Sequence, residues 1–386
     1  MNGLRPFGPA PLLAVGVSGG PHSLALAVLA SEWVAARGGR VLALVADHGL
    51  RPGSAAEARG VLAQLGRLGI ASRLLPLGLM PGPGLHERAR EARLGALLAA
   101  AGAEGAPWLL FGHHRADQAE TVAFRALRGS GEAGLAGMAP ARPAVEALVL
   151  RPLLGVAPGR IEAFLAARRL DPLRDPSNED PRFARARLRL GLGDLGGEGP
   201  AIAALAAAAE GFAARRARMR TAVAERLAGA AEFREEGWAR LDGAALGRDG
   251  VAEAALSALI RALGGRVHPP ARVAVSALLA RGGGSLGGAL WRSGLVLREP
   301  ARCAPPVPAR VGVVWDGRWR VLSAPAGTMV GARGAGPRIE GLPSLVAAGL
   351  PVLRNAAGEA IAGIVAASGR EGGWAVEFSP VSGPLA

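Results

Sequence analysis

Between residues 12 and 170, short apolar runs alternate with longer stretches in which apolar residues recur at helical spacing. Runs of four to eight apolar residues without charge are typical of buried strands. The predicted strands cover residues 12–17, 41–46, 70–77 and 108–111. The predicted helices cover residues 54–68, 85–101 and 116–127, and a further helix opens at Ser23. This alternation predicts an α/β domain built on a doubly wound parallel sheet.

Glycine or polar residues follow three of the predicted strands directly. They are Ser18-Gly19-Gly20, Asp47-His48-Gly49 and Gly112-His113-His114. In a doubly wound sheet, ligands bind beyond the carboxyl ends of the strands, where these three segments converge. The pattern therefore predicts a nucleotide-binding domain.

Residues Ser18 to Ser23 join the first predicted strand to the first predicted helix. The Gly19-Gly20 pair lets backbone N–H groups converge on an anion, and the helix N-terminus adds a partial positive charge. The turn is not a GxGxxG motif, and GxxxxGK[ST] is absent from the sequence. Taken alone, the turn is either a phosphate site or an ordinary strand–turn–helix connection.

The pattern changes after residue 190. A Gly-rich stretch at 191–200 is predicted as a linker, and a long helix follows at 201–230, with Arg215, Arg216, Arg218 and Arg220 clustered on it. Those arginines either contact phosphates or form a solvated face. Further helices are predicted at 251–263 and 271–279, and short strands around 311–315 and 319–322. The expected domains are residues 1–190, which hold the predicted nucleotide-binding sheet, 201–306 as a mainly helical region, and 307–386 as a small β-containing module.

Composition narrows the function. The formal net charge is +14, and all 45 basic residues are arginine because the sequence contains no lysine. Codon bias explains the choice of arginine, whereas a surface for nucleic acid explains the excess over acidic residues. Cys303 is the only cysteine, which excludes an intramolecular disulfide, CxxC redox chemistry and a cysteine-based zinc site. No apolar run approaches the ~20 residues of a membrane helix, so a cytoplasmic protein without membrane association is expected.

The segment from Gly112 to Gly131, GHHRADQAETVAFRALRGSG, gathers several chemically active side chains. His113 and Asp117 are four residues apart, which predicts that both project from one face at the start of a helix. Glu120 lies almost one turn further along. An imidazole and two carboxylates near a strand end are able to bind Mg²⁺, position a nucleophile or polarise a base. Helix capping and surface charge are the alternative explanation.

Several segments together resemble a known family. The turn resembles SGGxDS, the pyrophosphate-binding loop of the N-type ATP pyrophosphatases (the PP-loop superfamily), with His22 where that motif carries Asp. Residues 112–131 resemble the GHHxxDxxET…LLRGSG signature of tRNA(Ile)-lysidine synthetases. Further matches are Asp47-His48-Gly49-Leu50-Arg51, Gly137-Met138, Arg151-Pro152-Leu153-Leu154, Asp175-Pro176-Ser177-Asn178 and Arg185-Ala186-Arg187-Leu188-Arg189, the last with Ala186 in place of Asn. Their order identifies residues 12–190 with this family, and beyond residue 200 the resemblance is only general.

The resemblance implies a reaction. Enzymes of this family use ATP to adenylate the C2 oxygen of cytidine 34 in the CAU anticodon of an isoleucine tRNA. Free lysine then displaces AMP to give lysidine, and decoding changes from AUG to AUA. The implied partners are that tRNA and free lysine, the implied cofactors are ATP and Mg²⁺, and a homodimer is the assembly considered.

The resemblance also assigns roles to residues. Asp117, His113 and Arg185 are the expected catalytic residues. The expected pyrophosphate-binding residues are Ser18, Gly19, Gly20, Pro21, His22 and Ser23. Arg128, Arg151 and Glu120 are further candidates for contacts with substrate or tRNA. The residues that hold the metal are not assigned.

His22 is the departure that bears on activity. A neutral imidazole is a poor ligand for Mg²⁺ and an imidazolium repels it, but an imidazolium is able to contact the polyphosphate directly. The hypothesis is therefore a weakened but real activity. The alternatives are another tRNA-modifying pyrophosphatase, such as a 2-thiocytidine or 2-thiouridine synthetase, which relies on cysteines, and a tRNA-binding homologue that has lost catalysis. A GMP or asparagine synthetase type of ligase accounts for neither the charge nor the signature.

Overall fold

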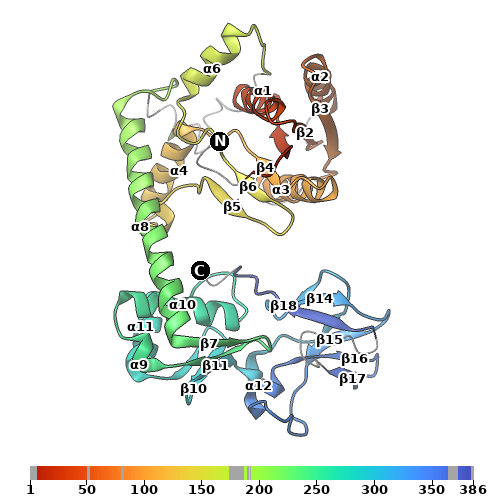
Figure 1. The fold of residues 1–386 in the computed structure, drawn as a ribbon, viewed down its shortest axis with the longest axis vertical. Coiled ribbons are helices and arrows are strands. Elements are labelled where there is room, and N and C mark those ends of the chain that lie inside the picture. Colours follow the sequence, from red (N-terminus) through yellow and green to blue (C-terminus); the bar gives the residue numbers. More distant parts are fainter. Residues whose placement is uncertain are drawn as a thin grey trace. The chain divides into compact units, whose positions relative to one another are not determined.

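The structure is a computed structural model that describes residues 7–49, 53–79, 82, 84–173, 187–188, 191, 193–363 and 373–383. Arg185, the 175–178 segment and residues 50 and 51 lie outside these ranges. The chain divides into two compact units, residues 1–216 and 217–386 (Figure 1). All the motifs named above fall within the first unit, which therefore carries the candidate site.

A six-stranded sheet forms the centre of the first unit, in the order β3-β2-β1-β4-β6-β5 (Figure 1). The strands are β1 (Leu12–Val17), β2 (Arg40–Asp47), β3 (Ala71–Pro76), β4 (Trp108–Leu110), β5 (Ala141–Pro143) and β6 (Leu148–Leu150). Every neighbouring pair is parallel except β5 and β6. The predicted doubly wound sheet is confirmed, with an added antiparallel edge strand.

Alternation along β1 builds two cores. Leu13, Val15 and Val17 are buried against α1 (Pro21–Ala35), α2 (Ser54–Arg67) and α6 (Pro158–Ala167) on one face. Ala14 points to the other face, where Leu97 of α3 (Leu85–Ala103) covers the sheet. Because side chains of a strand alternate between faces, an unbroken apolar run can serve both cores at once. This burial on both sides holds the strand ends, and the loops after them, in fixed positions.

The predicted linker is folded against the first unit. The Asp194 carboxylate accepts hydrogen bonds from the backbone N–H groups of Gly197, at 2.8 Å, and Gly199, at 2.6 Å. Arg115, the first residue of α4 (Arg115–Leu127), donates to the Gly197 carbonyl at 2.6 Å. Residues 193–199 are therefore an ordered turn that leads into the next helix and not a free spacer.

Helix α8 (Pro200–Ala230) begins in the first unit and ends in the second. Its start and its length agree with the sequence prediction, and Ile202 packs with Ala116 and Ala119 of α4. At the other end, Val223 and Leu227 join the core of the second unit. Within the part of the chain that the structure describes, no helix combines the length and apolar content needed to cross a membrane.

The second unit contains three antiparallel sheets, in the orders β7-β8-β11-β10-β9, β12-β15-β16-β17 and β13-β14-β18. The first comprises β7 (Ala231–Arg234), β8 (Trp238–Leu241), β9 (Gly284–Leu286), β10 (Ala289–Arg292) and β11 (Leu295–Arg298). Between β8 and β9 the chain forms the helices α9 (Gly243–Leu246), α10 (Gly250–Leu263) and α11 (Arg272–Arg281). The predicted helices of region 201–306 are thus present, but that region also holds a five-stranded sheet that the sequence did not reveal.

The remaining elements of the second unit are short. They are the 3₁₀ turn Pro300–Arg302, β12 (Val307–Pro308), β13 (Val314–Trp315), β14 (Trp319–Ser323), β15 (Met329–Ala332), α12 (Ser344–Ala348), β16 (Pro351–Arg354), β17 (Ala360–Gly363) and β18 (Ala375–Phe378). The strands predicted around 311–315 and 319–322 correspond to β13 and β14. The C-terminal part is β-containing, as expected.

A buried ion cluster ties these sheets together. Asp316 accepts hydrogen bonds from Arg298, at 2.6 and 3.0 Å, and from Arg318, at 2.7 and 3.1 Å. Arg298 also donates to the carbonyls of Gly264 and Gly288, at 2.8 and 3.1 Å. All three charged side chains are buried. One carboxylate therefore bridges two desolvated guanidinium groups between β11 and the C-terminal strands.

Candidate active site

The loop from Ser18 to Ser23 is closed by its own serines. The Ser18 backbone N–H donates to Ser23 Oγ at 3.2 Å, and Ser23 Oγ donates to the Gly20 carbonyl at 3.0 Å. Gly19 has φ +84°, and a Cβ there would lie 2.5 Å from the Val61 side chain. Helix α1 starts at Pro21 with Gly20 as its N-cap, two residues before the predicted start. The loop thus presents the first N–H groups of a helix, an arrangement suited to a phosphate.

The end of β4 lies directly against this loop. A Cβ on Gly112 would lie 2.7 Å from the His22 carbonyl oxygen, so only glycine fits there. The His22 ring meets the ring of His114 edge to face, with centroids 4.0 Å apart. Because His114 is buried, the His22 ring packs against a side chain that is itself fixed by its surroundings. The turn and the GHH segment, about 90 residues apart in the sequence, therefore form one site.

Asp117, which the sequence predicts to be catalytic, also stabilises the start of a helix. Its carboxylate accepts from the His114 backbone N–H at 3.0 Å, while the His114 side chain accepts from the Asp117 N–H at 3.4 Å. This reciprocal capping box starts α4 at Arg115. His113 precedes the cap and lies outside the helix, so the prediction that His113 and Asp117 share one helical face is wrong. The histidine that contacts Asp117 is His114.

His113 belongs to a group of basic residues at the same edge of the sheet. Burial, and after it the positive charges of Arg151, Arg90 and Arg93, together lower the pKa of His113 to about 3. Burial, together with Arg93, also lowers the pKa of His48 at the end of β2. The pKa values of Arg93 and Arg151 are themselves lowered, first by burial and then by neighbouring arginines. Desolvation and repulsion of this kind indicate basic side chains that lie close together, and Asp47 is an acidic neighbour that raises the pKa of His48.

Three nitrogen atoms of this group lack partners. Within the described chain, His48 Nδ1, His113 Nδ1 and Arg151 Nε are buried and make no hydrogen bond. A buried polar atom left unpaired is costly, and an anionic ligand is able to accept hydrogen bonds from the Arg151 guanidinium and from imidazole N–H groups beside it. His113 and Arg151 were predicted from the sequence as site residues, whereas Arg90 and Arg93 were not. Arg90 and Arg93 are three residues apart on a predicted helix, which places both on one face. This spacing was the feature of the sequence that could have indicated a basic group.

The pH dependence of stability tests the burial of His113. The unfolded chain protonates this side chain near pH 6.5 and the folded chain only near pH 3, so wild-type stability falls as pH falls through that window. His113→Asn is expected to remove up to about 1.4 kcal/mol per pH unit from that slope. Urea unfolding at several pH values between 6.5 and 4 measures it. The exposed His268 provides a control, and equal slopes for His113→Asn and His268→Asn would contradict the prediction.

The structure separates the other candidates. Arg151 lies in the basic group, and Glu120 is buried on α4. Arg128 follows the last residue of α4, roughly 16 Å along the helix axis from Asp117 at 1.5 Å per residue. Arg128 is therefore remote from the loop that would hold ATP.

The residues described here do not fit a magnesium ion held by the protein. His22 occupies the loop position where the family motif supplies a carboxylate, and Asp117 is engaged in the helix cap. Within the described ranges, no group of three or more His, Cys, Asp or Glu side chains is placed to hold a metal ion. No chemical step below is routed through Mg²⁺.

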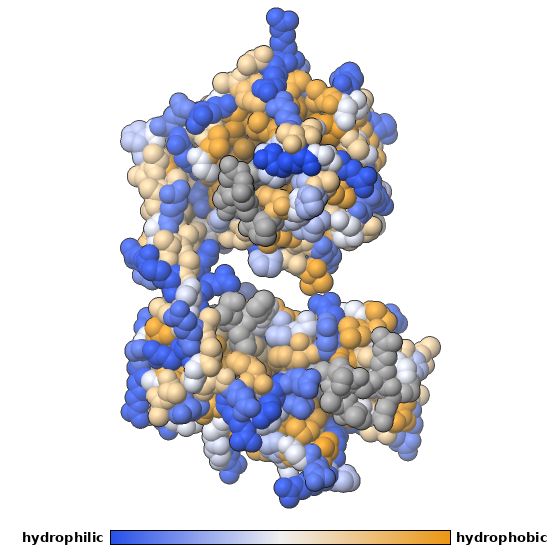
Figure 2. Space-filling model, in the orientation of Figure 1, coloured by the Kyte–Doolittle hydropathy of each residue, from blue (hydrophilic) through white to orange (hydrophobic). Residues whose placement is uncertain are grey.

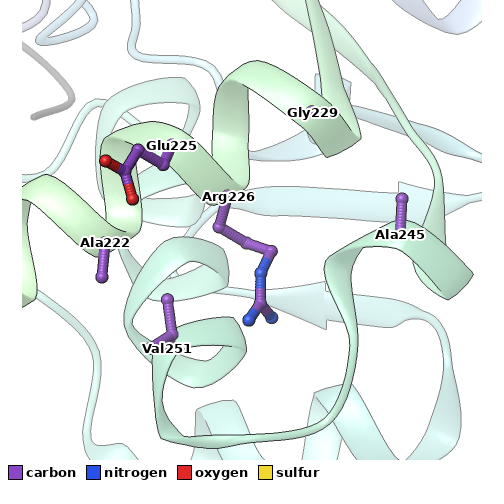
Figure 3. A pocket seen from close by; sticks show the side chains of 6 residues that line it. All are labelled: Ala222, Glu225, Arg226, Gly229, Ala245 and Val251. Atoms are coloured by element: carbon purple, nitrogen blue, oxygen red, sulfur yellow. The ribbon is translucent and has the colours of Figure 1, made fainter.

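A surface pocket of about 370 Å³ lies in the second unit (Figure 3). It is lined by Ala222, Glu225, Arg226, Gly229, Ala245 and Val251. The Arg226 guanidinium is paired with Asp249 at 2.9 Å and also donates to the Leu246 carbonyl. The cation is thus satisfied within the protein, and the pocket resembles a structural junction more than a ligand site.

Comparison with known proteins agrees with the site. A PP-loop domain model matches residues 5–195, in agreement with the strand–loop–helix geometry of residues 12–35. The tRNA(Ile)-lysidine synthase of Rhizobium meliloti is 35% identical over 87% of this chain and 78% of its own length. The chain therefore belongs to the tRNA(Ile)-lysidine synthase family.

Identity is higher where the aligned part is shorter. The tRNA(Ile)-lysidine synthase of Bradyrhizobium sp. strain BTAi1 is 44% identical over 59% of this chain and 63% of its own length. That of Rhodopseudomonas palustris is 46% identical over 49% of this chain and 56% of its own length. The chain thus spans less than two thirds of these two relatives. A solved U34-tRNA thiolase, NcsA from Methanococcus maripaludis, gives a TM-score of 0.45 at 16% identity over 54% of this chain and 74% of its own, a likeness too weak to support an inference.

Proposed function

We propose that this protein converts cytidine 34 of an isoleucine tRNA with a CAU anticodon to lysidine. In the first step the C2 oxygen of the cytosine attacks the α-phosphorus of ATP, and pyrophosphate leaves. In the second step the ε-amine of free lysine attacks C2, the C2–O bond breaks, AMP leaves, and the amine nitrogen loses its proton. The proposal follows from family membership and rests on the chemistry of the site.

One observation carries the proposal. A phosphate-type loop and a half-buried group of arginine and histidine side chains, three of whose nitrogen atoms are unpaired, lie at the same edge of one sheet. The loop is suited to the pyrophosphate leaving group, because a glycine-containing turn at a helix N-terminus favours the binding of an anion. His113, Arg93 and Arg151 are suited to a second anion, either the α-phosphate of ATP or the carboxylate of lysine.

Asp117 is the proposed acceptor of the proton from the lysine amine. A carboxylate also attracts the ammonium form and positions it for attack. His113, with a pKa of about 3, is a weak base at neutral pH, so we assign it to orientation through hydrogen bonding. Arg185 keeps its proposed role in contacting substrate or tRNA, and Glu120 a proposed role in supporting that contact from the core of α4.

The cofactor and partners follow the family. ATP is the proposed nucleotide, and Mg²⁺ is proposed only as the ion that ATP itself carries, with no described carboxylate assigned to it. Residues 201–306 are proposed to bind tRNA, because the chain carries a net charge of +14 and clustered arginines in this region are suited to a polyanion. A cytoplasmic location and a homodimer remain proposals of the same kind.

Release of pyrophosphate tests the class of function. We expect release from ATP to require an isoleucine tRNA transcript with a CAU anticodon, because adenylation needs the base as nucleophile. Release without any tRNA would favour a small-molecule ligase. Tight tRNA binding without release would favour a homologue that binds tRNA but lacks catalysis.

Restoring a carboxylate at position 22 tests the departure from the motif. His22→Asp is expected to raise turnover about tenfold, equivalent to ~1.4 kcal/mol of barrier, because a carboxylate is the better partner for a nucleotide-bound Mg²⁺. Steady-state pyrophosphate release at several Mg²⁺ concentrations measures the effect. His22→Asn is the matched uncharged control. No gain, or a loss, would show that this chain has adapted to the imidazole.

A further inference from the structure

The surface at the far end of α4 carries two arginines whose guanidinium groups lie over phenylalanine rings. The Arg128 guanidinium lies 4.4 Å from the centroid of Phe124, and that of Arg215 lies 5.1 Å from the centroid of Phe212. Stacking holds a guanidinium plane in one orientation, so less entropy is lost when its N–H groups bind an anion. Each arginine is thus preorganised for a ligand.

Helices α4 and α8 bring the two stacks together. Ile202 and Leu205 near the start of α8 pack with Ala116 and Ala119 near the start of α4. Arg215 pairs with Glu132, at the start of α5 (Glu132–Leu135), at 3.5 Å. The two helices therefore run side by side in the same direction (Figure 1), and Arg215 lies beside the loop that follows Arg128. Figure 2 shows hydrophilic side chains along the middle of α8.

This surface, which we call the Arg–Phe edge, is exposed except at its two half-buried phenylalanine rings. It comprises Phe124, Leu127, Arg128, Glu132, Phe212 and Arg215. The Leu127 side chain is 80% exposed and that of Arg215 is 59% exposed, so neither side chain is part of the hydrophobic core. The Arg215–Glu132 pair is exposed on both sides and is worth little, which leaves the arginine able to exchange Glu132 for another anion.

We propose that the Arg–Phe edge binds the sugar–phosphate backbone of the tRNA beside the anticodon. The proposal rests on the proposed function and extends it to a second contact. Arg128 lies roughly 16 Å along α4 from Asp117, so a ligand that reaches both must be long and polyanionic. Flat guanidinium groups contact phosphates through their edges and unpaired bases through their faces, and both are present in an anticodon arm. The exposed Leu127, next to Arg128 in the sequence, suits a sugar or base face.

Contacts to phosphates carry no sequence information, which defines the expected result. Arg128→Ala/Arg215→Ala is expected to weaken binding of the isoleucine tRNA transcript roughly tenfold at ~0.1 M salt. The slope of log K against log salt should fall by about two. An initiator methionine transcript with the same CAU anticodon should lose affinity to the same degree.

The chain offers a matched control on α1 and α6. Arg168 lies 4.0 Å from the Phe164 ring centroid and pairs with Glu32 at 3.0 Å, and Arg37 lies 4.1 Å from the ring centroid of Trp33. Arg37→Ala/Arg168→Ala removes the same charge and the same type of stack. Fluorescence anisotropy across a salt series compares the two double variants, and thermal melting checks that each is folded.

Three outcomes decide the proposal. Loss of affinity and of salt slope in Arg128→Ala/Arg215→Ala alone supports it. Equal behaviour of the two double variants overturns the edge but leaves the proposed function intact. A wild-type protein that binds neither transcript, while still releasing pyrophosphate from ATP with another acceptor, overturns the proposed function and the edge together.

Discussion

Replacement of Asp117 by asparagine is expected to lower kcat for lysine transfer by about 100-fold or more, with the fold intact. Asparagine keeps an oxygen that accepts the hydrogen bond from the His114 N–H, so the start of α4 is preserved. It removes the negative charge that attracts the lysine ammonium and accepts its proton. Single-turnover transfer of labelled lysine to tRNA measures the loss.

Asp117→Ala separates capping from chemistry. It should lose both the cap, worth about 1 kcal/mol of stability, and the activity. Asp117→Asn should lose only the activity. Wild-type turnover in Asp117→Asn would contradict the catalytic assignment and leave Asp117 as a capping residue.

Replacement of Asp316 by alanine is expected to destabilise the second unit by about 3–5 kcal/mol. Arg298 and Arg318 are buried and share this one carboxylate, so its removal leaves two desolvated cations without a counter-charge. Burial already lowers the pKa of Arg318, whereas Asp316 raises it. Urea unfolding, followed by tryptophan fluorescence from Trp315 and Trp319, measures the change.

Glu377→Ala is the matched control for Asp316→Ala. Glu377 pairs with Arg320 at 3.4 Å, and its side chain is half exposed. Removal of an exposed pair is expected to cost no more than about 1 kcal/mol. Equal losses for the two variants would show that the buried cluster is solvated in solution.

Local patterns predicted the elements that build the site. An apolar run followed by Ser18-Gly19-Gly20 predicted a strand, a phosphate-type turn and a helix. Apolar residues favour burial and glycine permits positive φ, so both features follow from residue type alone. The long helix α8 was equally legible from composition. The five-stranded sheet of the second unit was not, because its strands are only three or four residues long and fall between helices. Tertiary pairing, which no local window contains, defines them.

The site itself was predicted only in part. The meeting of the turn with the GHH segment followed from the topology of a parallel sheet. Two residues of the site were not predicted. His114, adjacent to the predicted His113, is the N-cap of α4 and accepts a hydrogen bond from the Asp117 N–H. Arg93 of α3 contributes to the basic group. A charged residue on an amphipathic helix is usually solvated, so burial of Arg93 depends on packing that the pattern does not contain.

Transfer of lysine to tRNA is the measurement that tests the central claim most directly. Purified protein is incubated with ATP, Mg²⁺, labelled lysine and an isoleucine tRNA transcript with a CAU anticodon, beside an initiator methionine tRNA with the same anticodon. The account predicts that label enters the isoleucine tRNA alone and that removal of ATP abolishes it. Binding of the transcript without any transfer of label would contradict the account and assign this protein to tRNA binding without catalysis.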